Sequence, residues 1–405
     1  MTSNSTNPMP RVSLLEAIEL TVVNWWTQLT TGERMPIAYV SQPGAGKSSI
    51  IYSQLPMSLA AFLNADPERT EIANKIIALT DHDPIEQGQW QAHHFYINPL
   101  MCPTQEGVIA QGLPVPMRTT PTDGSPASAY TVLAPSRLSR PNTSEPFTIT
   151  LLDEFDKGMP DFKMAMSEFI NSGRIGDTQL PITNYCVLAM NRSEDRSGST
   201  NMPMHIQNRI DEVHIKVNLA DWIAWANKNT TLTHTAMGLV QYKPDIMVDV
   251  VPKAVEPYCT YRSFTKAMQG LAFSDVLNPN QSHNMRRTRL VAAIGQTAAT
   301  DYFAYEKFEA KCTSYADIMA DPEHAPVPTE LGVQWAQNMC LWNNVKDKDS
   351  PKVFKYMLRM PKQFWATLLE HKLMDCPTLF SDSDYIQWVS KDENLTFLTR
   401  VAAYR

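Results

Sequence analysis

The sequence is poor in several features that mark specialised classes of protein. Its six cysteines lie far apart and include no Cys-x-x-Cys pair, which argues against a zinc site and against a disulfide framework. No apolar run approaches the roughly 20 residues that a bilayer-spanning helix needs, and residues 1–10 lack the cationic and apolar regions of a secretory signal. We therefore expect reduced thiols, a cytoplasmic location and no membrane partner.

Positive charge is scarce as well. The chain has 35 Lys and Arg against 42 Asp and Glu, which gives a formal net charge of −7. This balance argues against a surface dedicated to nucleic acid, because such surfaces need clustered cations. Hydrophobic residues nevertheless make up 43% of the 405 residues and charged residues 19%, so the composition is globular. At this length we expect two or three compact units.

A glycine-rich stretch, SQPGAGKS at residues 41–48, follows a short apolar run at 37–40 and precedes a segment that can be helical. In such a loop the glycines let backbone N–H groups turn inward around a phosphate. Lys47 would reach the terminal phosphates, Ser48 would hold Mg²⁺, and the following helix would direct its positive end at the anion. Ser41 stands where the strict motif has glycine, which makes the turn out of the strand less permissive.

A second nucleotide motif comes later, in FTITLLDE at residues 147–154. The apolar run predicts a buried strand, and ligands of open α/β sheets bind at the carboxyl ends of such strands. Asp153 would hold the water shell of Mg²⁺, and Glu154 would orient and polarise the attacking water. Adjacent Asp and Glu residues are also common at protein surfaces without any such function, but the two motifs together favour a nucleoside triphosphatase.

Two further polar residues follow predicted strands. The strand expected at 185–190 ends at Asn191, whose amide could contact both the attacking water and the γ-phosphate. The alternative is that Asn191 only caps the next loop. Arg209 comes just before an alternating strand expected at 213–217, in the position of an arginine finger that reaches a neighbouring subunit. The alternative is an ordinary surface charge.

The remaining chain supplies the context of these motifs. Ser13 and Glu16 have the spacing of a capping box, and they begin an amphipathic helix in which we expect Trp25 and Trp26 to be core residues. Residues 99–147 contain nine prolines, which predicts a surface loop or hairpin that contributes to an oligomer pore or to a partner contact. The alternative is that this insertion is a flexible surface segment without a specific role. Residues 81–83, Asp-His-Asp, indicate a solvated turn rather than a metal site.

The segments SQPGAGKS, LLDEFDK, VLAMN, IQNRID and TYRSF occur in the order typical of MoxR-like AAA+ ATPases, and the chain resembles that family. Residues 111–116, 221–226 and 295–305 add to the likeness, whereas the last hundred residues match only loosely. The resemblance implies an α/β fold, with an AAA+ P-loop NTPase core on a parallel sheet, an α-helical lid and a helical C-terminal region. The expected domains are 1–218 for the core with its insertion at 99–147, 219–300 for the lid and 301–405 for the extension.

The resemblance also implies ATP and Mg²⁺ as cofactors. The nucleotide-binding residues that it implies are Gly44, Ala45, Gly46, Lys47, Ser48, Ser49 and Asp153, of which Ser48 and Asp153 serve the metal. The catalytic residues that it implies are Glu154 to activate water, Asn191 as the first sensor, Arg209 as the finger acting on a neighbour and Arg262 as the second sensor in the lid.

Some positions depart from the family pattern or extend it. Tyr261 stands where the family usually has proline before the second sensor, and Arg192 stands where it has proline after the first. Both departures bear on the geometry of the sensors. Asn98, at the expected end of the second strand, occupies the place of a residue that restrains the catalytic Glu in related ATPases.

The function expected from the motifs and the resemblance is ATP hydrolysis by a homo-oligomeric ring, a hexamer, that remodels a protein client. Family members commonly work with a protein that carries a von Willebrand factor A domain, so the resemblance implies such a partner. A DNA-directed motor of the same superfamily is one alternative, and the acidic balance counts against it. A scaffold that binds nucleotide without turnover is a second alternative. A P-loop small-molecule kinase is a third, and it is disfavoured because it would need neither Glu154 nor an arginine finger.

Overall fold

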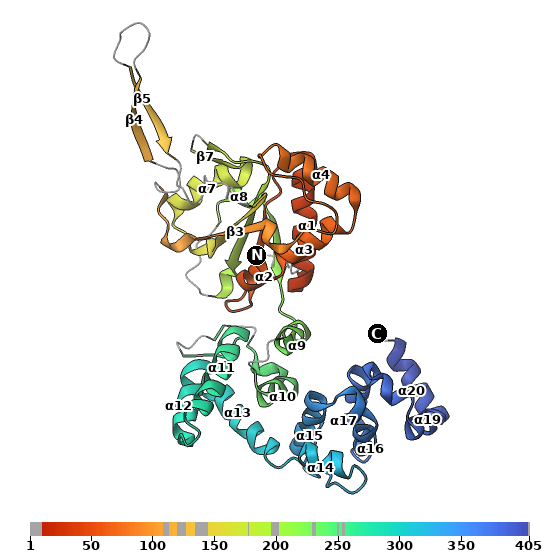
Figure 1. Cartoon of the computed structure of the whole chain (residues 1–405). Helices are drawn as coiled ribbons and strands as arrows, with labels where there is room; N and C mark the ends of the chain where they lie inside the picture. The colour runs from red at the N-terminus through yellow and green to blue at the C-terminus, as the bar shows by residue number, and fades with distance from the viewer. Residues whose placement is uncertain are drawn as a thin grey trace, which may run out of the picture. The chain divides into compact units, whose positions relative to one another are not determined.

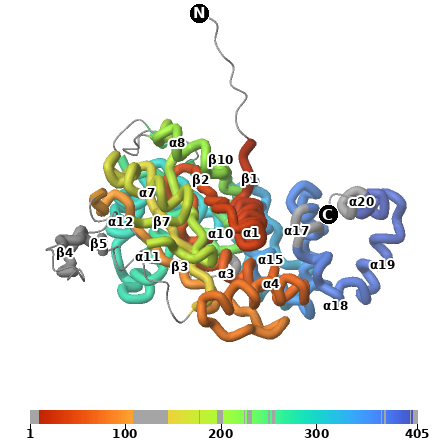
Figure 2. The backbone as a smooth tube through the Cα atoms, turned by 90° about the horizontal axis from the view of Figure 1, so that it is seen from above, coloured from red at the N-terminus to blue at the C-terminus, as the bar shows by residue number. Residues whose placement is uncertain are grey.

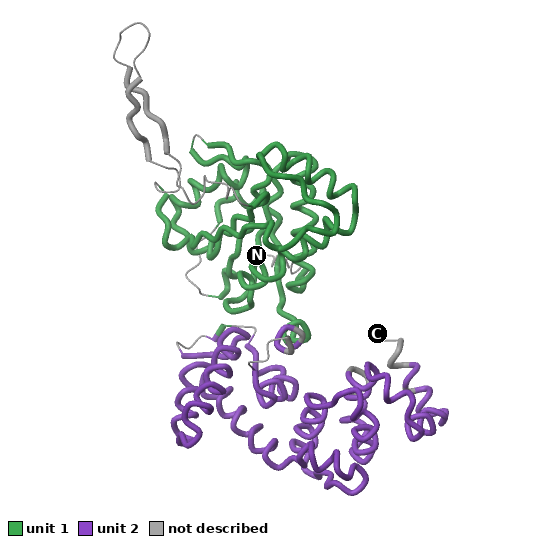
Figure 3. The backbone as a smooth tube through the Cα atoms, viewed as in Figure 1, with its two compact units in different colours: residues 1–222, 249–251 green, residues 223–248, 252–405 purple. Residues whose placement is uncertain are grey.

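The computed structural model describes residues 10–107, 113–119, 127–133, 145–176, 178–195, 202–228, 232–248, 251–252 and 256–403. The chain divides into two compact units (Figure 3). Unit 1 comprises residues 1–222 and 249–251, and unit 2 comprises residues 223–248 and 252–405. The predicted core, 1–218, falls within unit 1.

Unit 1 is built on a six-stranded sheet in which every neighbouring pair of strands is parallel. Its strands, in spatial order, are β1 (Arg11–Val12), β10 (Asp211–Ile215), β2 (Ile37–Ser41), β9 (Asn184–Asn191), β6 (Phe147–Asp153) and β3 (Phe95–Met101). All residues of β2 and β9 are buried. Continuous burial is expected of central parallel strands, because helices cover both faces of such a sheet.

Helices cover the two faces of this sheet in separate layers (Figure 1 and Figure 2). On one face, Tyr39 of β2 shares a core with α1 (Leu14–Thr31), α3 (Leu55–Asn64) and α4 (Pro67–Ala78). On the other, its neighbour Val40 shares a core with α7 (Pro160–Ser172) and α8 (Met204–Gln207). Successive side chains of a strand point to opposite faces, so one apolar strand supplies both cores.

The N-terminal helix agrees with its prediction. The Ser13 backbone N–H donates to Glu16 Oε2 at 2.6 Å and the Glu16 N–H donates to Ser13 Oγ at 3.2 Å, so the capping box is complete. Trp25 is fully buried and packs edge-on against Phe95 and Phe147. The predicted core role of Trp25 is therefore confirmed.

The proline-rich insertion contains a two-stranded antiparallel ribbon, β4 (Leu113–Thr119) with β5 (Ala127–Leu133), which is labelled at the upper left of Figure 1. A surface hairpin was one predicted form of this segment, and its role at a pore or partner stays a prediction. The rest of the insertion at 108–112, 120–126 and 134–144 lies outside the described residues, including part of the family-like segment 111–116. A second, short hairpin joins β7 (Arg174–Ile175) to β8 (Thr178–Gln179).

Unit 2 is helical, with no strand among its described residues. The helix α9 (Leu219–Lys228) crosses the boundary between the units. The helices that follow are α10 (His234–Tyr242), α11 (Tyr261–Leu277), α12 (His283–Ile294), α13 (Gln296–Glu309), α14 (Tyr315–Ala320), α15 (Leu331–Asn344), α16 (Ser350–Met357), α17 (Lys362–His371), α18 (Pro377–Phe380), α19 (Ser383–Val389) and α20 (Asp392–Ala403). Residues from 315 to 398 form a hydrophobic core of their own.

The fold class predicted from the sequence, an α/β P-loop NTPase core on a parallel sheet with a helical region, is confirmed. Details differ. The last core strand is 211–215 rather than 213–217, and the predicted boundary at 300 falls inside α13, which runs on unbroken. Among the described residues, no helix is both long and apolar enough to span a membrane.

Candidate functional site

Three central strands end at one edge of the sheet, and their last residues are the ones that the motifs singled out. β2 ends at Ser41, β9 at Asn191 and β6 at Asp153. Ser41 and Asn191 are direct partners in the parallel register of β2 and β9. This carboxyl edge is where open α/β sheets bind ligands, so the fold brings the two nucleotide motifs together.

The glycine-rich loop turns sharply between β2 and α2 (Lys47–Ser53). Gly44 has φ 79° and Gly46 has φ 92°, a left-handed conformation that favours glycine. A Cβ at Gly46 would approach only Leu14, at 3.9 Å, so the backbone angle rather than crowding explains the glycine there. Ala45 is buried in the loop, and Ser49 is exposed in the first turn of α2.

Lys47 is buried at the centre of the site. Its Nζ donates to the carbonyl and hydroxyl oxygens of Ser41, both at 3.1 Å, to the carbonyl of Gln42 at 3.2 Å and to Asn191 Oδ1 at 3.2 Å. The hydroxyl of Ser41 is therefore part of the site, a role that a glycine could not have. The sequence showed Ser41 only as a departure from the motif.

Ser48 and Asp153, the two metal ligands expected from the sequence, are in contact. Ser48 Oγ donates to Asp153 Oδ2 at 2.7 Å. Both are hard oxygen donors, which suits Mg²⁺, an ion that keeps several waters and is bound through one or two carboxylates together with substrate phosphates. In the described part of the chain, no group of three or more His, Cys, Asp or Glu residues forms a cage for a metal ion. The donor set thus fits Mg²⁺ bound together with a nucleotide.

Glu154 lies just beyond β6, in a left-handed turn with φ 53° and ψ 40°. Its N–H donates to Asp153 Oδ1 at 2.9 Å, and its carboxylate pairs with Lys157 Nζ at 2.9 Å. A non-glycine residue in this backbone conformation is strained, and such strain gathers at functional sites. The ion pair with Lys157 was not predicted, although LLDEFDK contains both residues.

Asn191 is buried and held from two sides. Its backbone N–H and its Nδ2 donate to the Asp156 carboxylate at 3.1 and 3.4 Å, while its Oδ1 accepts from Lys47. Asn191 therefore contacts Lys47 of the glycine-rich loop directly, in addition to its contacts with Asp156. Sequence reasoning missed Asp156, and its one signal was an acidic residue in the turn after a buried strand.

The structure corrects the interpretation of Asn98. β3 continues to Met101, so Asn98 lies three residues before the strand end, opposite Thr150 of β6. The prediction placed this strand at 94–98, with Pro99 outside it. β3 is an edge strand, and an edge strand tolerates proline where the missing N–H would face away from the sheet.

The two predicted arginines are exposed. Arg209 follows α8 two residues before β10, and among the described residues its guanidinium makes no hydrogen bond or ion pair. Arg262 lies in the first turn of α11, which Thr260 caps in unit 2. Their roles as finger and second sensor stay predictions.

Arg192, one of the departures from the family pattern, has a structural role. Its Nε and one terminal nitrogen donate to the two carboxylate oxygens of Asp195 at 3.0 and 2.7 Å, and both side chains are buried. Such a bidentate pair has a defined geometry. It fixes the turn that follows Asn191 without a proline.

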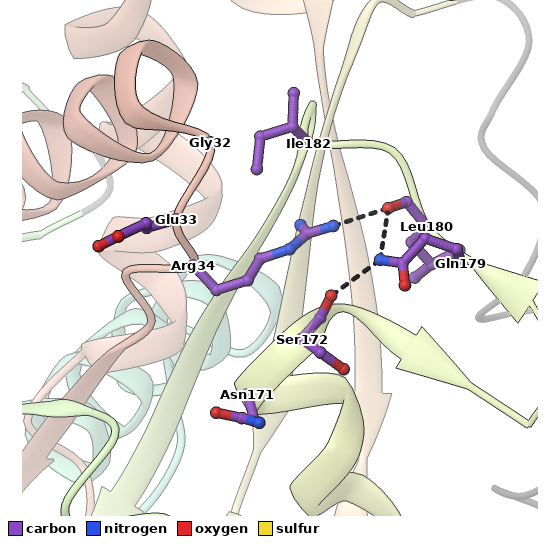
Figure 4. Close-up of a pocket in the computed structure, with 8 residues that line it drawn as sticks. All are labelled: Gly32, Glu33, Arg34, Asn171, Ser172, Gln179, Leu180 and Ile182. Atoms are coloured by element: carbon purple, nitrogen blue, oxygen red, sulfur yellow. Dashed lines mark hydrogen bonds between the residues drawn. The ribbon is translucent and has the colours of Figure 1, made fainter.

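A pocket of about 460 Å³ lies at the opposite end of β2, near Arg34 (Figure 4). The Arg34 guanidinium donates to the carbonyls of Leu180 and Pro181 at 2.7 and 3.1 Å, and burial lowers its pKa. Gln179 Nε2 donates to the Ser172 carbonyl at 2.8 Å across the same pocket. These contacts tie β8 to the start of β9, far from the glycine-rich loop along β2, and we assign them a structural role.

No family model matches the chain, and the comparison with curated proteins finds no match. Among solved structures, the chain is similar to a protein from Cytophaga hutchinsonii that is provisionally described as an ATPase. That similarity has 9% identity and a TM-score of 0.25, and it covers 70% of this chain and 85% of the other. A similarity this low supports no statement about function.

Proposed function

We propose that the protein is a Mg²⁺-dependent ATPase. One observation carries the proposal: five side chains with complementary tasks meet at the carboxyl edge of a parallel sheet. They are Lys47, Ser48, Asp153, Glu154 and Asn191. A glycine-rich loop with two left-handed glycines leads directly into this group, as the cradle of a phosphate requires.

Each side chain has a definite task in this proposal. Lys47 would exchange its contacts with Ser41 and Gln42 for the β- and γ-phosphate oxygens, and Ser48 with Asp153 would hold Mg²⁺. When bound, Mg²⁺ neutralises charge that develops on the phosphates. Glu154 would orient the attacking water and accept its proton, and for this its carboxylate has to be released from Lys157.

The finer proposal is a ring-forming, MoxR-like AAA+ ATPase that remodels a protein client and works with a von Willebrand factor A domain protein. The order of the short motifs supports it, and so does the exposed Arg209, which is available to a neighbouring copy. A hexamer is the assembly that we propose.

The test replaces Glu154 by glutamine and measures nucleotide binding and phosphate release separately. Glu154→Gln keeps the shape of the side chain but cannot accept a proton, so ATP should still bind while turnover falls on the order of 10²-fold or more. Glu71→Gln, a change on the exposed face of α4, is the matched control. Near-normal turnover of Glu154→Gln would assign the chemistry to another group.

A nucleotide-binding scaffold without turnover is the second candidate. The ion pair of Glu154 with Lys157 favours it, because a carboxylate held in this way is not available as a base. The wild-type protein decides between the two functions. ATP binding with no phosphate release, in the presence and absence of added protein extract or DNA, would support the scaffold.

A further inference from the structure

Two buried charged side chains beneath the site have no part in the proposed function. Asp156 is 6% exposed and Lys163 is 1% exposed. Charged side chains are almost never fully buried unless they are paired and hydrogen-bonded, because leaving water costs them several kcal/mol. The contacts of Asp156 and Lys163 next to Asn191 therefore need a physical explanation.

Asp156 determines the orientation of the Asn191 side chain. A carboxylate can only accept hydrogen bonds, so the side chain of Asn191 must turn its NH₂ group toward Asp156, to which Nδ2 donates at 3.4 Å. The backbone N–H of Asn191 donates to the other carboxylate oxygen at 3.1 Å. The amide oxygen is left on the opposite side, where it accepts from Lys47 at 3.2 Å.

Lys163 holds Asp156 in place from α7. Its Nζ donates to the Asp156 carbonyl at 2.8 Å and lies over the ring of Phe155 at 5.9 Å from the centroid. Burial lowers the pKa of Lys163, and the negative charge of Asp156 opposes that shift.

We propose that Asp156 is a positioning residue that makes Asn191 turn its amide oxygen, a hydrogen-bond acceptor, toward a nucleotide bound at the glycine-rich loop. This inference rests on the proposed function. An acceptor repels phosphate oxygens but can bind Lys47 and an O–H of the attacking water. Asn191 therefore aligns water during hydrolysis and does not recognise the γ-phosphate.

The first arm of the test compares ATP with ADP. Asn191→Ala should change the ratio of ATP to ADP dissociation constants by less than about threefold, while kcat falls about tenfold or more, as expected for the loss of one hydrogen bond in the transition state. Titration calorimetry measures the affinities with and without Mg²⁺. A tenfold selective loss of ATP affinity would show that Asn191 donates to the γ-phosphate and would overturn the inference.

The second arm changes Asp156 itself. An asparagine at this position can donate as well as accept, so Asp156→Asn lets the Asn191 amide turn over, and kcat should fall with little change in KM. Glu168→Gln, on the exposed face of α7, is the matched control. The double variant Asp156→Asn, Asn191→Ala should have the same kcat as Asn191→Ala alone, because Asp156 acts on the reaction through Asn191.

Folding is controlled for in the same series. Asp156→Asn removes a negative charge that acts on the buried Lys163, so the double variant Asp156→Asn, Lys163→Met, which removes both charges, is measured beside it. Wild-type kcat in a folded Asp156 variant would overturn the inference and leave the proposed function standing. A wild-type protein that binds no nucleotide would instead refute the proposed function, and this inference with it.

Discussion

The buried ammonium of Lys47 is the cation of the proposed site. Four of its hydrogen bonds go to neutral oxygens of Ser41, Gln42 and Asn191. A bound triphosphate would offer negative oxygens in their place, and hydrogen bonds to charged groups are roughly twice as strong as neutral ones.

Lys47→Ala should weaken ATP binding at least about tenfold, because a hydrogen bond between charged groups contributes about 1.5–3 kcal/mol. Titration calorimetry measures the loss. Lys75→Ala is the matched control, since Lys75 is exposed on α4, where it forms an ion pair with the exposed Glu71. Wild-type ATP affinity in Lys47→Ala would remove the glycine-rich loop from the proposed site.

The residues of the site were predictable to different degrees. Lys47, Ser48 and Asp153 follow from motifs whose spacing is fixed by the backbone. The Ser41 hydroxyl and Asp156 could not be predicted in the same way, because their roles depend on which way a side chain turns at the end of a strand. Orientation of this kind is a tertiary property and leaves no periodic trace in the sequence.

At the scale of elements, two glycines inside helices differ in their surroundings. A Cβ added to Gly270 of α11 would meet nothing within 4 Å, whereas one added to Gly238 of α10 would overlap the hydroxyl of Tyr305. Gly270 is thus replaceable, and Gly238 makes room for an aromatic ring of α13.

Gly270→Ala should raise the free energy of unfolding by about 0.5–1 kcal/mol, because alanine loses less backbone entropy in a helix. Gly238→Ala should lower it by about 1–3 kcal/mol, the usual cost of overpacking a core. Urea denaturation of both variants measures the difference. Equal effects of the two changes would mean that the packing of α10 against α13 is looser than the structure shows.

The elements themselves were predicted best where they are most buried. The strands β2, β6 and β9 were located to within one or two residues, because central parallel strands are continuous apolar runs. α4 was missed, since its sequence is largely polar and only Thr70, Ala73 and Ile77 are buried. β3 was predicted to end at Asn98, before Pro99. Proline is excluded from central strands but is tolerated in an edge strand such as β3.

At the scale of the whole molecule, the question is whether one chain is sufficient for activity. Unit 1 contains every side chain of the proposed site except Arg262. Arg209 is exposed and follows the short helix α8, and the proposed ring would assign it to the site of another copy.

If Arg209 is a finger, Arg209→Ala should bind ATP normally and lose on the order of 10³-fold or more in turnover. Mixing it with Glu154→Gln should restore part of the activity, because an interface with an intact Glu on one side and an intact Arg on the other can form. Phosphate release is measured across mixing ratios, and a tag pull-down verifies mixed assemblies. Normal turnover of Arg209→Ala alone would leave Arg209 as a surface charge.

The pairing of the first strand with the last has a mechanical consequence. β10 hydrogen-bonds to β1 on one side and to β2, which leads into the glycine-rich loop, on the other. The chain leaves β10 at Ile215 and continues into α9. A pull along the axis of β10 would shear the hydrogen bonds with both parallel neighbours at once instead of peeling them one by one, so β10 would transmit tension to the strand that precedes the loop.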